Sequence, residues 1–184
     1  MKKLILFLSF FITILAFSKT NTYAQQKASG SSAVLATNVS VAKEDIRAKV
    51  LRKFLEKYNS PLAPYAQTFI AEADKNNLDW KFVAAISGLE STFGQQIPYG
   101  SYNAWGWGIY GTNTKYFSSW DEGIQTVSEG LRNNYMDKWG ATNTYEIGSI
   151  YASSPTWAVR VEYWMRAIEA FRLKNPQNVL SISI

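Results

Sequence analysis

The chain has 184 residues, of which 19 are Lys or Arg and 14 are Asp or Glu, and it contains neither Cys nor His. The missing Cys and His exclude disulfides, the usual transition-metal ligands and any Ser-His or Cys-His nucleophile, so no metal or cofactor is expected. Hydrolytic chemistry in this chain would have to use carboxylates, Lys, Tyr or backbone groups.

The first 24 residues have the pattern of a secretory signal peptide. Lys2 and Lys3 precede an apolar run over 4–17, and a polar stretch then ends in small residues at Ala24. The run is shorter than the about 20 apolar residues of a membrane span, which favours a cleaved signal over a retained anchor. The pattern predicts a secreted or cell-envelope protein with no stable membrane span after cleavage after Ala24.

Loss of residues 1–24 would change the charge of the protein. Three of the 19 basic residues lie in this segment and no acidic residue does, so 16 basic and 14 acidic side chains would remain, a net charge of +2. A charge this small does not indicate a nucleic-acid partner. Residues 25–42 are small and polar without a sustained period, and they are expected to form a flexible linker.

The sequence from 43 to 176 predicts one mainly α-helical domain, followed by a short tail over 177–184. Apolar side chains recur with helical spacing in six segments, without any internal repeat. Asp79 and Ser119 are expected to be N-caps, and Glu122 completes a capping box with Ser119. The expected helices cover 44–58, 64–76, 80–92, 120–138, 144–151 and 155–174.

Residues 95–118 lack a helical period and are rich in Gly, Tyr, Trp, Asn and Thr. They predict a long loop or a small β-hairpin, and loops of this length in a compact domain are usually functional. Aromatic rings can stack on the apolar faces of sugars, and Asn103 could bond an N-acetyl group. Core packing is the alternative for the aromatic residues, and a nucleic-acid groove would need more cations than Lys115. The aromatic residues of this loop with a candidate binding role are Tyr102, Trp105, Trp107 and Tyr110.

Glu90 is a carboxylate on an otherwise apolar helix stripe. Phe82, Ile86 and Glu90 follow one another at a spacing of four residues and therefore share one helix face. Desolvation on such a face would favour the protonated form and raise the pKa, as a general acid requires. Taken alone, however, a single Glu near a helix end is more simply explained as a side chain that turns into solvent.

Three ordered motifs change this interpretation. The segment AAISGLESTFG over 84–94 resembles the Glu-Ser helix end of lysozyme-like cell-wall enzymes, most closely the glucosaminidases of glycoside hydrolase family 73. Asn103 and Gly108-Ile109 are similar to the turn that follows that helix end. The segments over 116–131 and 151–161 resemble the family's next helix entry and its Tyr-Ala-x-x-Pro-x-Tyr/Trp-Ala motif, and the likeness spans about 65–174.

The resemblance implies a lysozyme-like helical domain that cleaves β-1,4 bonds in peptidoglycan as an endo-β-N-acetylglucosaminidase. It implies Glu90 as the acid and Tyr151 beside it in the cleft, with peptidoglycan or a related N-acetylated glycan as the partner of a monomeric enzyme. The expected substrate-binding residues are Ser91, Tyr102, Asn103, Trp105, Trp107, Tyr110 and Trp157.

A second carboxylate is missing from the expected place. No Asp or Glu lies between Ser91 and Trp120, although most glycosidases use two carboxylates, and the nearest downstream are Asp121 and Glu122. With one acid, either the substrate's N-acetyl oxygen or the muramyl 6-hydroxyl could attack the sugar, the latter as in lytic transglycosylases. A catalytically silent glycan-binding module and a surface scaffold domain also remain open at this point.

Overall fold

The computed structural model describes residues 44–108 and 113–175. The predicted signal peptide over 1–24, the predicted linker over 25–42, the predicted tail over 177–184 and Tyr110 lie outside the described residues, as does Ile109 of the Gly108-Ile109 pair. No helix in the described ranges is long and apolar enough to cross a membrane.

The described residues are mainly helical, as the sequence predicts. The loop between the third and fourth α-helices contains no β-strand in its described part, so only the loop alternative is seen there. The elements are α1 (Ile46–Lys57), a short 3₁₀ helix η1 (Ala63–Tyr65), α2 (Ala66–Lys75), α3 (Phe82–Ser91), α4 (Trp120–Gly130), a π-helix η2 (Leu131–Lys138), α5 (Thr144–Tyr151) and α6 (Trp157–Lys174).

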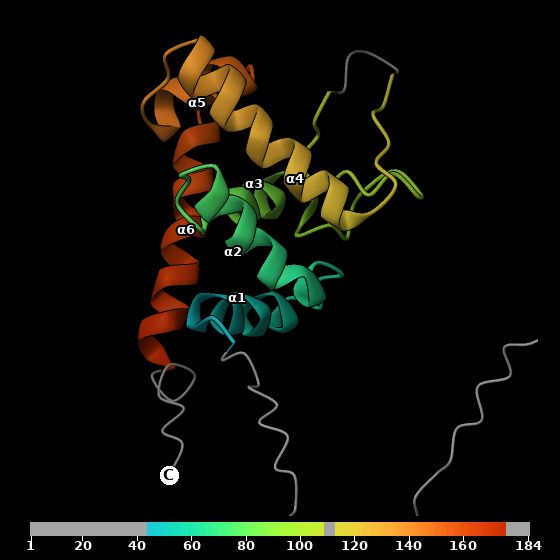
Figure 1. Ribbon diagram of the computed structural model, residues 1–184, viewed down its shortest axis with the longest axis vertical. Coiled ribbons are helices and arrows are strands. Elements are labelled where there is room, and N and C mark those ends of the chain that lie inside the picture. The colour runs from blue at the N-terminus through green and yellow to red at the C-terminus, as the bar shows by residue number, and fades with distance from the viewer. Residues whose placement is uncertain (1–43, 109–112, 176–184) are drawn as a thin grey trace, which may run out of the picture. The chain divides into compact units, whose positions relative to one another are not determined.

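The last helix connects the other elements. α6 contacts α1, α3 and α5, and Figure 1 shows α1 and α5 near opposite ends of it. α2 lies between α1 and α4 and contacts both. The start of α6 therefore lies beside α5, and this is the end of the domain at which the candidate site is found.

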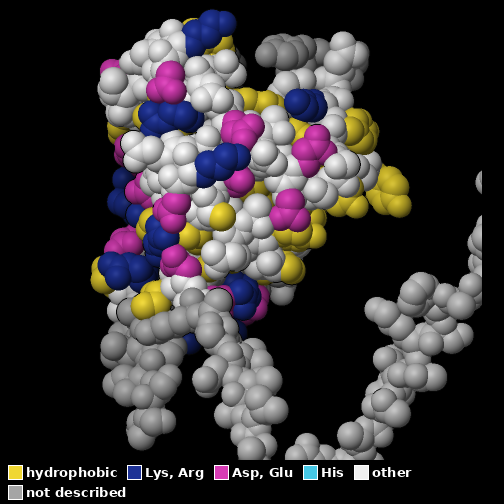
Figure 2. Space-filling view, in the orientation of Figure 1, with side chains coloured by type: hydrophobic (Ala, Val, Ile, Leu, Met, Phe, Trp, Pro, Cys, Tyr) yellow, Lys and Arg dark blue, Asp and Glu magenta, His cyan; other side chains and the backbone are white. Residues whose placement is uncertain are grey.

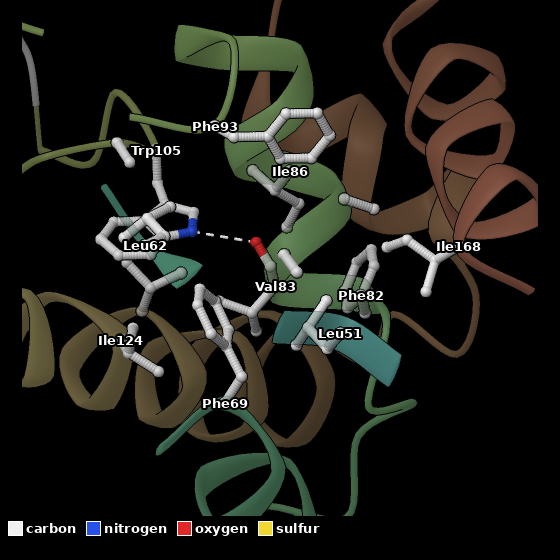
Figure 3. Packing of buried hydrophobic residues seen from close by; sticks show 14 of the residues in the cluster. Leu51, Leu62, Phe69, Phe82, Val83, Ile86, Phe93, Trp105, Ile124 and Ile168 are labelled. Atoms are coloured by element: carbon white, nitrogen blue, oxygen red, sulfur yellow. Dashed lines mark hydrogen bonds between the residues drawn. The ribbon is translucent and has the colours of Figure 1, made fainter. Parts of the chain in front are cut away.

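α3 is the most buried helix of the domain. Every residue from Phe82 to Gly88 is buried, because the helix is covered by α6, α2 and α4. Trp105 from the following loop enters the same core, and its indole Nε1 donates to the Val83 carbonyl at 2.9 Å (Figure 3). The end of α3, which carries Glu90, is thus held by a well-packed core.

The helix starts follow the predicted caps with two differences. The Ser119 hydroxyl accepts the Glu122 N–H at 3.1 Å, but the Glu122 carboxylate accepts from the backbone and hydroxyl of Ser118 rather than from Ser119. Asp79 accepts the Lys81 N–H in a turn, and α3 itself begins only at Phe82. Asp79 therefore closes the turn before the helix instead of capping the helix.

The predicted regular helix over 120–138 is interrupted. It is α-helical only to Gly130 and continues as the π-helix η2, whose wider turns change the direction of the side chains that follow. π-helical turns are rare and are frequent at functional sites.

The surface seen in Figure 2 is mixed in charge. Lys and Arg side chains alternate with Asp and Glu side chains, and no large area of one sign is visible on this face. Hydrophobic side chains gather at the edge formed by the loop between α3 and α4, where Tyr99 and Tyr116 are among the exposed aromatic residues.

Candidate active site

Glu90 lies in the last turn of α3, at the point where the helix stops. Thr92 ends the helix in the left-handed conformation, with φ 52°. The Glu90 side chain reaches solvent, in contrast to its buried neighbour Ser91. Its Oε1 accepts the indole N–H of Trp157 at 2.7 Å.

The second oxygen of Glu90 faces the loop backbone at Gly106. A Cβ atom at this position would lie 3.5 Å from Oε2, and Gly106 has φ 62°, a conformation that glycine adopts without strain. This distance is an ordinary van der Waals contact, so the backbone conformation, and not lack of space, favours glycine here. The Trp157 hydrogen bond to Oε1 is the interaction that orients the carboxyl group.

The surroundings of Glu90 favour its protonated form. Burial of the carboxyl among protein atoms raises the pKa of Glu90 above the usual value, although part of the side chain is open to water. The Trp157 hydrogen bond and the positive charge of Arg160 oppose this rise, because both stabilise the carboxylate. The apolar stripe predicted that the pKa of Glu90 is raised. The two residues that oppose this rise, Trp157 and Arg160, both lie on α6.

Tyr151 lies beside this pair at the end of α5. Its ring stacks on Trp157 with centroids 4.7 Å apart and an interplanar angle of 26°. Its hydroxyl donates to the Trp105 carbonyl at 2.6 Å, so it is engaged by the loop rather than by Glu90. Burial, and then the charge of Glu90, raise the pKa of Tyr151 well above 10, so the phenol stays protonated.

Two further rings surround Tyr151. The rings of Trp107 and Tyr135 each lie 5.8 Å from Tyr151 and 5.8 Å from each other. Gly130 makes room for Trp107, since a Cβ atom there would come within 2.3 Å of the indole. We refer to Trp107, Tyr135, Tyr151 and Trp157 together as the aromatic row.

Four residues of the predicted site, Glu90, Tyr151, Trp107 and Trp157, lie next to one another. Trp157 differs from its predicted role in substrate binding. Its side chain is only 3% exposed, so it holds Glu90 instead of offering a face to a sugar. Tyr135 lies within the helix predicted over 120–138 and is not among the predicted site residues. Tyr135 lies in the π-helix η2, which changes the direction of its side chain. The spacing of apolar residues in the sequence does not reveal this type of helix.

The predicted sugar-binding role of Trp105 is wrong. The ring is completely buried, with 0% exposure, and its only polar atom is bonded to Val83. An indole in the core cannot stack on a ligand. Trp105 instead anchors the loop, and its ring sits so close to α4 that a Cβ atom at Gly123 would lie 2.7 Å from it.

Asn103 and Ser91 are also structural, contrary to the prediction. Asn103 is 2% exposed; its Nδ2 donates to the carbonyls of Trp107 and Lys115, and its Oδ1 accepts the Trp107 N–H. The Ser91 hydroxyl donates to the Ala104 carbonyl at 2.7 Å and accepts the Gly94 N–H. Their polar groups hold the loop and are not available to a substrate.

Tyr102 is 37% exposed but lies apart from the aromatic row in its contacts. Its ring meets the edge of Trp120 at 5.4 Å, at the start of α4. Its predicted contact with substrate stays a prediction.

Neither downstream acid serves as a partner for Glu90. Asp121 accepts the Thr68 hydroxyl at 2.6 Å, and Glu122 is bonded to Ser118, which lowers the pKa of Glu122. The charged group that acts on Glu90 is Arg160, a cation. In the described parts of the chain, Glu90 therefore stands without a second carboxylate, and no group of three or more acidic side chains there could hold a metal ion.

No family model and no curated protein matches the sequence. Two solved structures of S. aureus Autolysin E resemble the model. One, a catalytic mutant in complex with the disaccharide NAG-NAM, has a TM-score of 0.55 and 15% identity and covers 69% of this chain and 67% of its own. The other, in complex with the muropeptide NAM-L-Ala-D-iGlu, has a TM-score of 0.51, 14% identity and the same coverage.

The chain has the helical fold of this autolysin. The likeness confirms the predicted mainly α, lysozyme-like fold class. At this identity it concerns the fold alone, so the assignment of an activity rests on the geometry around Glu90.

Proposed function

We propose that this chain is an exported peptidoglycan-cleaving glycosidase in which Glu90 is the general acid, of the glucosaminidase type found in glycoside hydrolase family 73. The observation that carries the proposal is the Glu90 carboxyl itself. It combines a raised pKa with a defined orientation, because Trp157 donates a hydrogen bond to Oε1 at 2.7 Å. The fold is one in which a known autolysin binds NAG-NAM.

In the first step, protonated Glu90 donates its proton to the glycosidic oxygen as the bond from that oxygen to the anomeric carbon breaks. The carboxylate that forms keeps the Trp157 hydrogen bond and the nearby Arg160 charge, both of which stabilise it. Both interactions therefore stabilise the product of proton transfer and make the transfer from Glu90 more favourable. General acid catalysis of this kind contributes a factor of about 10² to 10⁴ in rate.

The single carboxylate favours substrate assistance. As the glycosidic bond breaks, the acetamido oxygen of the N-acetylglucosamine residue attacks its anomeric carbon and forms a cyclic oxazolinium ion. Water then adds to the anomeric carbon and displaces the acetamido oxygen, while Glu90 accepts the proton from water. Trp107 and Tyr135 offer partly exposed rings for contact with the sugar. If the cut follows a muramyl residue instead, the 6-hydroxyl of that residue attacks in place of water, and the enzyme is a lytic transglycosylase.

The test compares the purified protein with two variants on isolated cell walls. Glu90→Gln removes the proton donor at constant size, and Asp121→Asn is the matched control for an acid outside the site. We expect Glu90→Gln to lose at least about 100-fold in release of soluble products, and Asp121→Asn to remain active. Equal release by all three proteins would contradict the Glu90 mechanism, and walls bound but uncut by all three would indicate a binding module.

Mass spectrometry of the released fragments then identifies the bond that is cut. Reducing N-acetylglucosamine ends support the hydrolytic glucosaminidase. Anhydro-muramyl ends would instead show the transglycosylase reaction.

A further inference from the structure

Trp139 is a large aromatic side chain left at the surface. It is 50% exposed and follows the π-helix η2, and its ring meets the ring of Tyr135 edge-on, with centroids 4.9 Å apart at 71°. A half-exposed indole costs free energy in water, so an ordered one is a candidate contact for a ligand.

Trp139 contacts Tyr135 of the aromatic row, and Trp157 of the same row holds the candidate acid. Tyr135 lies 5.8 Å from Tyr151, Tyr151 stacks on Trp157 at 4.7 Å, and Trp157 donates to Glu90. Neighbouring rings thus connect the exposed indole to the candidate site through three elements, η2, α5 and α6. Trp157 is buried. The surface open to a ligand is therefore formed by the partly exposed rings of Trp107 and Tyr135, and Tyr135 contacts Trp139.

The backbone around Trp139 is well fixed. The Trp139 N–H donates to the Asn134 carbonyl at 2.9 Å, the i to i+5 bond of a π-helix. The two residues that follow donate to the carbonyls of Met136 and Tyr135, and Gly140 takes φ 75° to allow this ending. The backbone that carries the indole is thus ordered, and the ring itself packs against Tyr135, so less conformational entropy is lost when a ligand stacks on it.

We propose that Trp139, supported by Tyr135, forms a distal subsite that binds a sugar ring of the same N-acetylated glycan strand, away from the bond that is cut. The proposal rests on the proposed function of Glu90. A pyranose ring matches the size of a single exposed indole. A protein partner does not, because a stable protein interface buries about 800 Å² on each side, whereas the neighbours of Trp139 include the exposed polar side chains of Asn133, Asp137 and Lys138.

The test measures binding of N-acetylglucosamine oligomers of increasing length in the Glu90→Gln background, where cleavage does not interfere. Stacking contacts of this size correspond to roughly a 3- to 10-fold change in affinity. We expect Trp139→Ala to weaken the longest oligomers by that factor and to leave the shortest that bind almost unaffected, while Trp139→Phe restores part of the loss. The matched control is Tyr163→Ala, another exposed aromatic residue, which should keep the length dependence of the parent.

Two results would overturn the subsite. One is equal affinity of the parent and Trp139→Ala at every length, and the other is a uniform loss at every length, which would show a structural role. The outcome is separable from that of the proposed function. If Glu90→Gln still cleaves walls, the assigned acid is wrong. Binding is then measured from initial rates of association before cleavage, and a loss in Trp139→Ala that is confined to long oligomers still supports the subsite.

Discussion

Two aromatic regions that look alike in sequence do different things in the structure. In the loop segment over 101–105, Asn103 and Trp105 turn their side chains into the protein, where they are buried and bonded to backbone groups. Trp107, two residues after Trp105, instead contacts the rings of Tyr135 and Tyr151. Tyr151 in turn lies beside the Trp157 that holds Glu90. One part of a Gly- and aromatic-rich loop can thus hold the loop in place while another part lines a candidate site. The contacts of each side chain, and not the residue type, distinguish these two roles.

Removal of one indole from each region tests whether the two regions differ in their contribution to stability. Trp105→Ala should lower the free energy of unfolding by about 3–5 kcal/mol, because it opens a core cavity and removes the indole hydrogen bond to the Val83 carbonyl. Trp107→Ala should cost less, roughly 1–2 kcal/mol, since that ring is only partly buried, and should instead weaken glycan binding. Urea unfolding of both variants measures the difference; equal losses would show that the two regions are not distinct.

Asn103→Ala tests the anchor without opening a large cavity. The change removes two bonds to the carbonyls of Trp107 and Lys115 and one from the Trp107 N–H. A buried polar group left unpaired costs about 1–3 kcal/mol, so the free energy of unfolding should fall by that amount. A variant as stable as the parent but unable to bind N-acetylated sugars would instead restore the ligand role that the sequence predicted for Asn103.

Glu90→Gln should have the smallest effect on stability, and in the opposite direction. Because the pKa of Glu90 is higher in the folded protein than in the unfolded chain, its ionisation disfavours the folded state. The stabilising contribution of the protonated Glu90 to the folded state is present at acid pH and is lost as the pH rises through the pKa of the folded protein. The neutral Gln should therefore match or exceed the parent in Tm at pH 7. Thermal unfolding at pH 4 and pH 7 checks this, with Glu129→Gln, an exposed ion-paired acid, as the control. A lower Tm for Glu90→Gln at pH 7 would assign Glu90 a structural role.

Much of the fold is predictable because it depends on local patterns. The spacing of apolar residues placed α5 at Thr144–Tyr151, and the Ser119 cap marked the start of α4. The switch from α-helix to π-helix after Gly130 was not predictable, since apolar spacing continues through it. Tyr135 lies in this segment, and its contact with Tyr151 was therefore not predicted.

The site was predictable in part. The apolar stripe pointed to Glu90, the aromatic loop offered Trp107 as a candidate, and the resemblance to the glucosaminidases implied Tyr151 beside Glu90. The roles of Trp157 and Asn103 could not be predicted. The sequence does not show whether a Trp or an Asn near a site binds a ligand, a carboxylate or the backbone. Their burial and hydrogen-bond partners distinguish these cases.

The dependence of kcat/KM on pH, measured with soluble glycan strands for the parent and for Trp157→Phe, tests most directly the claim that Glu90 is an acid tuned by Trp157. Activity that needs protonated Glu90 must fall as the pH rises through the pKa of Glu90. Loss of the indole N–H removes a bond that stabilises the carboxylate, so the pKa should rise and the alkaline limb should move to higher pH. Trp164→Phe, on the same helix, should leave the limb in place; an alkaline limb that is unmoved in Trp157→Phe, or moved to lower pH, would contradict the account.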